Sequence, residues 1–291
     1  MSQIAFWGAV ELGLVFAFVA IGVYLAFRVL DFPDLTVDGS FPLGAAVTGV
    51  LILGGMNPWL AAIIAMIAGA AAGLVTATLN VRFKILNLLA SILTMIALFS
   101  VNLRVMGAPN ISLISQDTML TPFFGHGIPE YYVRPLFLFV LVAIAVFIVW
   151  RFLESDMGLA MRATGANPKM ARAQGVRTDR QIYLGMALSN ALVALGGALF
   201  AQTNGFADVT SGAGTIVVGL AAVIIGGTAL EGGRGTVVGT LVGLLLLGII
   251  SNGLVLEDVS SFWQPVVIGA LLLIAIILDE VRRRAALKVG R

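Results

Sequence analysis

Residues 151–181 read RFLESDMGLAMRATGANPKMARAQGVRTDRQ and separate two strongly apolar stretches, 135–150 and 182–201. This polar segment, called the island below, carries six of the chain's 17 Lys and Arg residues. It is too short to be a soluble domain, and the stretches on either side have the composition of membrane helices. The pattern predicts a basic surface loop that joins two transmembrane helices.

Composition extends this interpretation to the whole chain. Of the 291 residues, 59% are hydrophobic and only 11% are charged, and the mean hydropathy is +1.04. These values lie outside the range of soluble domains and indicate several transmembrane helices. The 34 glycines agree, because glycine is commoner in membrane helices and lets helices approach closely.

The apolar segments predict an all-α, polytopic integral membrane protein with about eight to nine transmembrane helices in a single domain, 1–291. Segments 41–56 and 215–230 have 16 residues each, or about 24 Å of helix, and are candidates for tilted or broken helices. The nine segments are 4–27, 41–56, 58–79, 85–103, 135–150, 182–201, 215–230, 235–254 and 263–278.

The distribution of Lys and Arg predicts the orientation. If the island is cytoplasmic and all nine segments cross, 15 of the 17 basic residues lie inside and only Arg104 and Arg134 lie outside. This bias predicts an N-out, C-in topology. Residues 104–134 then form the longest outer loop, and residues 151–181 form a cytoplasmic loop.

The island has the signals of two short capped helices. Asp156 is a candidate N-cap for a first helix that ends at Gly165. Asn167 is a candidate N-cap for a second, with Pro168 at its first position and Gly175 as its stop. Small apolar side chains among the basic residues suit docking into a groove of a soluble partner. The alternative is a loop that fixes topology and binds anionic membrane lipid. The apolar side chains are those of Leu159, Met161, Met170, Ala171 and Ala173.

Several kinds of chemistry are excluded by missing residues. No G-x-x-x-x-G-K-[ST] motif occurs, so the chain has no P-loop of its own for ATP. With one histidine, His126, and no cysteine, we expect no metal site and no haem site. No G-x-S-x-G elbow occurs either. We expect no enzyme activity and no bound cofactor.

Polar residues inside the apolar segments have two possible roles. Glu11 either lies near the outer headgroups or hydrogen-bonds to a neighbouring helix, or it lines a pathway. Asn87, Ser91 and Thr94 share one helix face at i, i+4 and i+7. They either form hydrogen bonds between helices or contribute to a translocation surface. The pair Gly69 and Gly73 and the series Gly235, Gly239 and Gly243 predict close-packing faces.

Residues 34–40, DLTVDGS, precede the short segment 41–56. Asp38 and Ser40 are good N-cap residues, so one interpretation is a helix capped at the membrane surface. The other is a half-helix that starts inside the membrane and points its N–H groups and positive dipole end inward, as transporter substrate sites do.

Three motifs resemble those of one protein family. DLTVDGS resembles the IDLSVGS element of bacterial sugar permeases, and residues 163–176, ATGANPKMARAQGV, resemble the ATPase-coupling segment ATGGNxxAAxxxGI. Residues 222–235, AVIIGGTALEGGRG, followed by Gly239, resemble the turn VIGGTSLxGGxGxxxG. Together they resemble the permease subunit of a type II ATP-binding-cassette (ABC) importer of the branched-chain amino-acid and ribose superfamily. Residues 27–39, FRVLDFPDLTVDG, are similar to a subgroup tied to tryptophan or tyrosine uptake.

The resemblance implies a multi-pass protein of the bacterial inner membrane that imports a small solute, with an amino acid favoured. It implies separate ABC ATPase subunits that bind the ATP, a periplasmic or lipid-anchored substrate-binding protein, and a second permease subunit in a homodimer. No nucleic-acid partner is expected. The implied ATPase-coupling residues are Gly158, Arg162, Gly165, Asn167, Met170, Ala171 and Gly175. The implied substrate-path residues are Asp34, Asp38, Ser40, Asn87, Ser91 and Thr94.

The alternative is a stand-alone secondary transporter or channel, with Glu11 or Asp38 as the ion-coupling site. It predicts uptake by vesicles that contain this chain alone. The capped island favours the importer, because a self-sufficient transporter has no evident need for a docking loop.

Overall fold

The computed structural model describes residues 3–124 and 129–226, with the short pieces 239–240, 242–243, 266–267, 269–270, 273–274 and 277. These residues are mainly helical, which confirms the all-α class. Within them, five helices are long and apolar enough to cross a membrane. They are α1 (Gln3–Val23) with its π-helical extension (Tyr24–Val29), α3 (Pro58–Val81), α4 (Asn87–Met106), α5 (Glu130–Glu154) and α8 (Thr178–Asn204).

Each long helix matches one of the predicted segments and extends past it at one end or both, although α4 begins at Asn87 rather than at the predicted residue 85. The clearest case is α5, predicted over 135–150 and observed over Glu130–Glu154. Its extra turns are polar and form ion pairs along the helix, Arg134 with Glu130 and Arg151 with Glu154. Such pairs let a helix continue beyond its apolar centre. The predicted segments 235–254 and 263–278 lie mostly outside the described residues.

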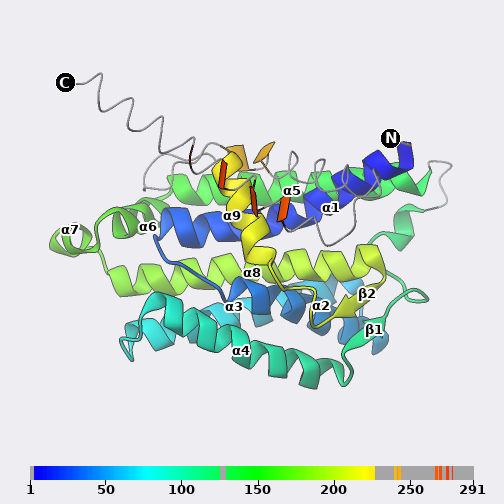
Figure 1. Ribbon diagram of the computed structural model, residues 1–291, viewed down its shortest axis with the longest axis horizontal. Helices are drawn as coiled ribbons and strands as arrows, with labels where there is room; N and C mark the ends of the chain where they lie inside the picture. The colour runs from blue at the N-terminus through cyan, green and yellow to red at the C-terminus, as the bar shows by residue number, and fades with distance from the viewer. Residues whose placement is uncertain are drawn as a thin grey trace.

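Helix α8 lies at the centre of the bundle and packs against α1, α2 and α3 (Figure 1). The predicted close-packing pair on α3 is confirmed. A Cβ atom at Gly69 would overlap the carbonyl oxygen of Asn190, and one at Gly73 would overlap that of Met186. Because Gly69 and Gly73 have no side chains, the backbones of α3 and α8 come into contact. Small residues hold membrane helices together in this way.

A second close-packing face was predicted from three glycines. Gly243 lies against the carbonyl oxygen of Ala222, and Gly239 lies against Gly226. These contacts agree with a packing role for Gly239 and Gly243. The third member, Gly235, lies outside the described residues.

Helix α2 (Val37–Leu53) begins halfway along the bundle. Ser40, in its first turn, bonds to Asn190 of α8, which lies twelve residues beyond Thr178, or about 18 Å along that helix. From there α2 follows α8 to the far end, where its Gly49 meets Ile111 and Ala207. Residues 30–36 therefore turn back from the end of α1 into the middle of the bundle. This supports the half-helix interpretation, with a start at Val37 rather than at the predicted residue 41.

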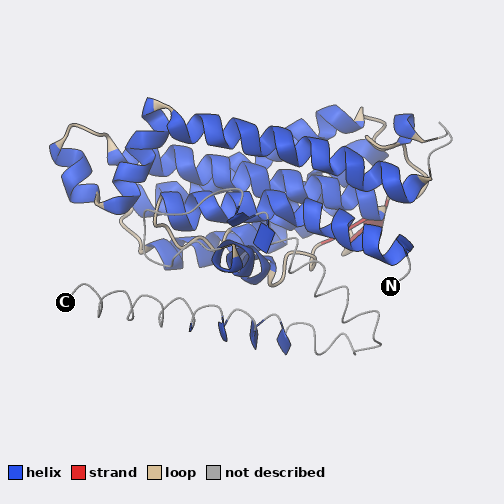
Figure 2. Cartoon of the chain, turned by 90° about the horizontal axis from the view of Figure 1, so that it is seen from above, coloured by secondary structure: helices blue, strands red, loops and turns tan. Residues whose placement is uncertain are grey.

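A second short apolar helix, α9 (Thr215–Ile225), crosses the others. In Figure 1 it runs across the long helices, and in Figure 2 it is seen end-on. It packs against α1, where Gly219 contacts Val23, and its first turn lies beside the first turn of α2. The N-termini of two short helices therefore meet inside the bundle.

The two ends of the bundle differ in structure. At one end, α6 (Asp156–Ala166) and α7 (Pro168–Ala173) project beyond the long helices (Figure 1). At the other end, β1 (Asn110–Ser112) pairs antiparallel with β2 (Phe206–Asp208). A 3₁₀ turn follows at Thr121–Phe123. The strand in the outer loop 104–134 was not predicted from the sequence.

Candidate functional site

A buried polar network holds the segment that turns back before α2. Asp34 is fully buried and lies beside α8. Its Oδ1 accepts a hydrogen bond from the backbone N–H of Thr36 at 2.9 Å, and its Oδ2 accepts one from Nδ2 of Asn190 at 2.8 Å. The hydroxyl of Thr36 bonds to that of Thr76 on α3 at 2.8 Å. The network thus joins three parts of the fold: residues 34–36, α3 and α8. Because Asp34 is buried, its oxygens do not contact a solute.

Asn190 is the centre of this network. Besides the bond to Asp34, it donates to the carbonyl oxygen of Met186 and accepts from the hydroxyl of Ser40 at 2.7 Å. Ser40 is fully buried too. Asp34 and Ser40 were predicted to line the substrate path, but the structure places both inside the protein, where they fix the start of α2. Asn190 is the donor that a buried carboxylate requires.

Asp38 caps a helix other than its own. The N-cap of α2 is Thr36, which makes no capping bond with its side chain. The carboxylate of Asp38 instead accepts from the backbone N–H groups of Ile216 at 2.7 Å and Gly214 at 3.2 Å. The expectation that Asp38 or Ser40 caps α2 is therefore wrong. Asp38 ties the first turn of α9 to the first turn of α2, with its charge at the positive end of α9.

A cavity of about 480 Å³ opens beside this junction, between α2, α4 and the segment before α9. Its lining combines apolar side chains with a few polar groups, the usual composition of a small-molecule site. The lining residues are Asp38, Gly39, Pro42, Met95, Ile96, Phe99, Ser100, Asn102, Val209, Thr210, Ala213 and Gly214. A second cavity, of about 400 Å³ between α1, α3, α5 and α8, is lined by apolar and aromatic side chains alone. It offers no side-chain partner to a polar solute.

The polar stripe predicted on α4 lies away from the cavity. The hydroxyls of Ser91 and Thr94 donate to carbonyl oxygens of their own helix, and the side chain of Asn87 accepts from that of Asn80 across the turn between α3 and α4. All three were predicted to line the path, but none of them lines this cavity. The stripe nevertheless continues at the same spacing through Leu98 to Asn102, which does line the cavity. Extending the pattern by two turns would have found it.

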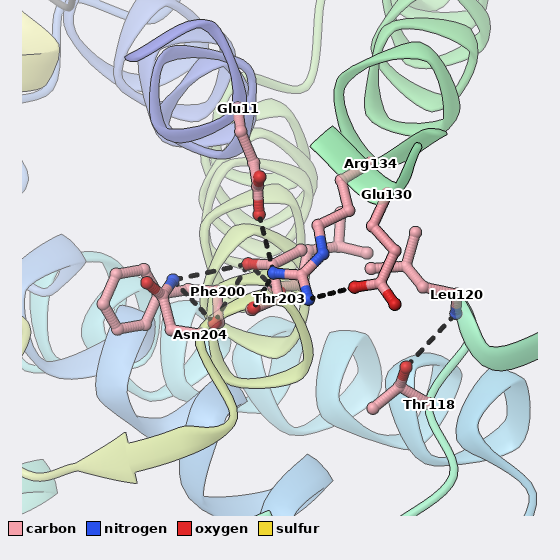
Figure 3. Close-up of polar contacts among 9 residues, drawn as sticks. Glu11, Thr118, Leu120, Glu130, Arg134, Phe200, Thr203 and Asn204 are labelled. Carbon is pink, nitrogen blue, oxygen red and sulfur yellow. Dashed lines mark hydrogen bonds and ion pairs between the residues drawn. The ribbon is translucent and has the colours of Figure 1, made fainter. Parts of the chain in front are cut away.

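Glu11 belongs to a cluster at the end of the bundle that carries the strands. Its carboxylate lies 4.0 Å from Arg134, which also pairs with Glu130 and donates to the carbonyl oxygen of Thr203 at 3.3 Å (Figure 3). These contacts join α1, α5 and the end of α8. They favour the interpretation of Glu11 as a bonding partner between helices over that of a pathway residue.

The island forms two short helices, as the sequence predicts, with one change in capping. Ser155, not Asp156, is the N-cap of α6: its hydroxyl accepts from the N–H of Gly158, and Asp156 is the first helical residue. Asn167 caps α7 as predicted and accepts from the N–H of Met170 at 3.0 Å. Gly175 has a φ of +84°, which suits a glycine stop.

Three of the island's seven predicted coupling residues, Gly158, Gly165 and Ala171, face the permease itself. Met161 and Ala171 are buried, so neither is the exposed knob that the sequence suggested. A Cβ atom at Gly158 would overlap the carbonyl oxygen of Phe152, and one at Gly165 would overlap that of Val29. These glycines press α6 onto the ends of α5 and α1. Small size at these positions serves packing within the chain rather than contact with a partner.

The outward face of the island is apolar and basic. Met157, Leu159 and Met170 are each about half exposed, at 49%, 52% and 51%, and Arg162 and Lys169 are exposed as well. We call these five residues the outer face. The guanidinium of Arg172 is held instead by Thr178 at 2.6 Å and Asp179 at 2.7 Å. Exposed apolar side chains with a basic rim have the composition of a binding surface.

The third motif, residues 222–235, is described only as far as Gly226. The rest of this motif lies outside the described part of the chain, and so does His126.

Comparison with known proteins gives the same picture. The family model described as "Branched-chain amino acid transport system / permease component" matches residues 8–276. A tyrosine transport system permease protein from Clostridioides difficile is 39% identical over 197 residues, 67% of this chain and 64% of that protein. The match thus spans a little less than two thirds of the tyrosine protein.

A second relative covers more of the chain. The ribose import permease protein RbsC from Bacillus subtilis is 31% identical over 281 residues, 96% of this chain and 83% of that protein. Among solved structures, PsaBC from Streptococcus pneumoniae in complex with Fab matches with a TM-score of 0.51 at 15% identity, over 95% of this chain and 90% of that one. This last likeness concerns the fold alone.

Proposed function

The chain belongs to the branched-chain amino acid transport system permease family and is a transport protein rather than an enzyme, and we propose that it is the membrane subunit of an ABC importer. In this proposal it forms the path of a small solute, and separate ATPase subunits supply the energy. A substrate-binding protein delivers the solute, and a second copy of the chain completes the path as a homodimer in the bacterial inner membrane.

The observation that carries the proposal is the meeting of α2 and α9 beside the 480 Å³ cavity. Both α2 and α9 begin within the bundle. Their first turns therefore bring backbone N–H groups, helix dipoles and one carboxylate to a depth at which a continuous membrane helix has only apolar side chains. Broken helices of this kind supply polar groups to solutes at the middle of a membrane. Of the residues predicted to line the path, Asp38 lines this cavity.

An amino acid is the favoured solute. The relative named for tyrosine transport supports this choice, while relatives named for ribose match a larger share of the chain. The cavity adds a physical reason, because Met95, Ile96 and Phe99 give it an apolar wall suited to an apolar side chain. A sugar needs polar partners around its whole ring.

The island is the proposed docking surface for the ATPase, through its outer face. Its inner side contacts the membrane helices, so a movement of the island would move them too. Gly165 contacts Val29 at the end of α1, and Gly158 contacts the end of α5. α6 also packs against α8, which carries Asn190. Displacement of α6 by the ATPase would therefore move the helices that hold the start of α2, and so change which side of the membrane the cavity faces.

Replacing both Leu159 and Met170 by aspartate is expected to abolish ATPase docking. Each change places a charge in the apolar part of the outer face, and loss of a central contact weakens binding by about 2 kcal/mol or more, roughly 30-fold. The measurement is co-purification of the ATPase with the permease and ATP-driven uptake in proteoliposomes. Both side chains are half exposed, so the permease itself should fold.

The matched control is Ile114→Asp, an exposed apolar residue at the opposite end of the bundle. It should leave ATPase binding unchanged. Normal docking and uptake by the doubly substituted protein would refute the docking assignment. Uptake by vesicles that contain this chain alone, without ATP, would instead favour a stand-alone ion-coupled transporter or channel.

A further inference from the structure

The polar groups on the wall of the 480 Å³ cavity are mostly hydrogen-bond acceptors. Among the described residues that line it, Asp38 alone carries a charge. Its two oxygens each accept one backbone N–H, from Ile216 and Gly214. A carboxylate has about four lone-pair positions, so roughly two remain for a ligand.

Asn102 supplies an acceptor that has no partner. Its Nδ2 donates to the carbonyl oxygen of Gly39 at 3.1 Å, which fixes the orientation of the amide, because the flipped amide would set two oxygens against each other. Its Oδ1 is buried and receives no hydrogen bond from any residue that the structure describes. The side chain is fully buried, and the residue lines the cavity. A buried acceptor without a partner is unfavourable, so we expect a bound ligand to supply the donor.

Thr210 adds a third acceptor. Both its hydroxyl and its backbone N–H donate to Asp208, so the hydroxyl presents only lone pairs to the cavity. Asp208 also brings a second negative charge close to the site. Ser100 is the lining hydroxyl that remains able to donate, since no described residue bonds to it.

The rest of the wall is apolar and consists of Pro42, Met95, Ile96, Phe99 and Val209 with small residues between them. A ligand that fits must therefore combine an apolar body with a group rich in N–H donors. A primary ammonium group has three such donors and no acceptor, which matches three acceptors and a negative charge. A metal ion of the Ca²⁺ type needs six or more oxygen ligands, which is more than the side chains of these residues offer.

We propose that Asp38, Asn102 and Thr210 form a recognition site for the primary ammonium group of the transported solute, with its apolar side chain against Met95 and Phe99. This inference rests on the proposed transport function and names the residues that select the solute. The permease would then discriminate among solutes itself. A sugar would leave the acceptors poorly matched, because each of its hydroxyls brings an acceptor as well as a donor.

The test is direct binding to the permease with its ATPase subunits in lipid nanodiscs, without the substrate-binding protein. The probes are tyramine and 3-(4-hydroxyphenyl)propionate, which share one aromatic body but carry an ammonium and a carboxylate respectively. We expect tyramine to bind at least about tenfold more tightly, since a charge-assisted hydrogen bond contributes that much or more. Asp38→Asn should reduce this preference at least about tenfold, and Thr210→Val should reduce it by a smaller factor.

Asp31→Asn is the matched control, because it removes an exposed carboxylate from the segment just before α2. Its φ of +53° is one that asparagine adopts as readily as aspartate. If Asp38→Asn does not fold, Thr210→Val still decides, because Thr210 is exposed. Equal binding of the two probes, or a preference that both variants retain, would overturn the site.

Failure of this inference can be told apart from failure of the proposed function. ATP-driven uptake of L-tyrosine by the complete wild-type importer tests the function. Uptake combined with an unchanged probe preference in Asp38→Asn would refute the ammonium site alone.

Discussion

Replacing Asn190 by leucine is expected to destabilise the protein by about 3–5 kcal/mol, enough to remove most folded permease from the membrane. The change deletes the Nδ2 donor that lies 2.8 Å from the carboxylate of Asp34 and the acceptor for the hydroxyl of Ser40. Asp34 is fully buried, so no water replaces the lost bond. The cost is that of a buried charge left without one of its partners. The measurement is the yield and the unfolding transition of purified protein.

Two controls separate this cause from a general effect of the substitution. Asn204→Leu makes the same chemical change at the exposed end of α8 and should cost well under 1 kcal/mol. The double variant Asp34→Leu with Asn190→Leu removes donor and charge together and should recover part of the loss. A single Asn190→Leu variant as stable as Asn204→Leu would show that the buried network contributes little.

Replacing Gly197 by leucine is expected to prevent folding. A Cβ atom at Gly197 would overlap the carbonyl oxygen of Phe41, and one at Gly44 would overlap that of Ala194, so α2 and α8 touch through their backbones. A flexible side chain could move aside, but a helix carbonyl cannot. A leucine there must push α2 away from α8 and break the bond between Ser40 and Asn190. Even alanine at either position should cost about 1–3 kcal/mol.

The comparison for Gly197→Leu is Gly8→Leu, at a helical glycine whose Cβ position has no atom within 4 Å. That change should be neutral or stabilising by up to about 1 kcal/mol, because leucine favours helix more than glycine does. Expression level and size-exclusion profile measure both effects. Well-folded Gly197→Leu protein would mean that α2 and α8 separate more easily than their contacts indicate.

The sequence predicts those parts of the fold that depend on a single segment. Long apolar stretches became helices, because each satisfies its own backbone hydrogen bonds in a membrane. The cap at Asn167 and the turn at Gly175 were also predictable, since both rest on neighbours within a few residues. The strand Asn110–Ser112 could not be predicted in this way, because its partner Phe206–Asp208 lies almost a hundred residues further along the chain.

The same limit applies to the site. Asp38 is a good cap by residue type, but Gly214, the N-cap of the helix to which it bonds, is 176 residues away, so its role depended on tertiary structure. Asp34 and Ser40 looked like path residues because they are polar within an apolar region, yet Asn190 satisfies both of them in the interior. Ala171 looked like an exposed knob, although packing of α7 buries it. Residue type indicated that these positions have a role, but only their burial in the folded protein shows which role it is.

The turn that carries Asp34 also sets an order of events during biosynthesis. Asp34 and its partner Asn190 are 156 residues apart. At 5–20 residues per second, the ribosome needs roughly 8–30 s to make the chain between them. Throughout that interval α2 is too short to span the bilayer. The carboxylate of Asp34, just before α2, also lacks its hydrogen-bond donor Asn190. The nascent chain must therefore hold residues 30–53 outside the lipid, or against the insertion machinery, until α8 emerges.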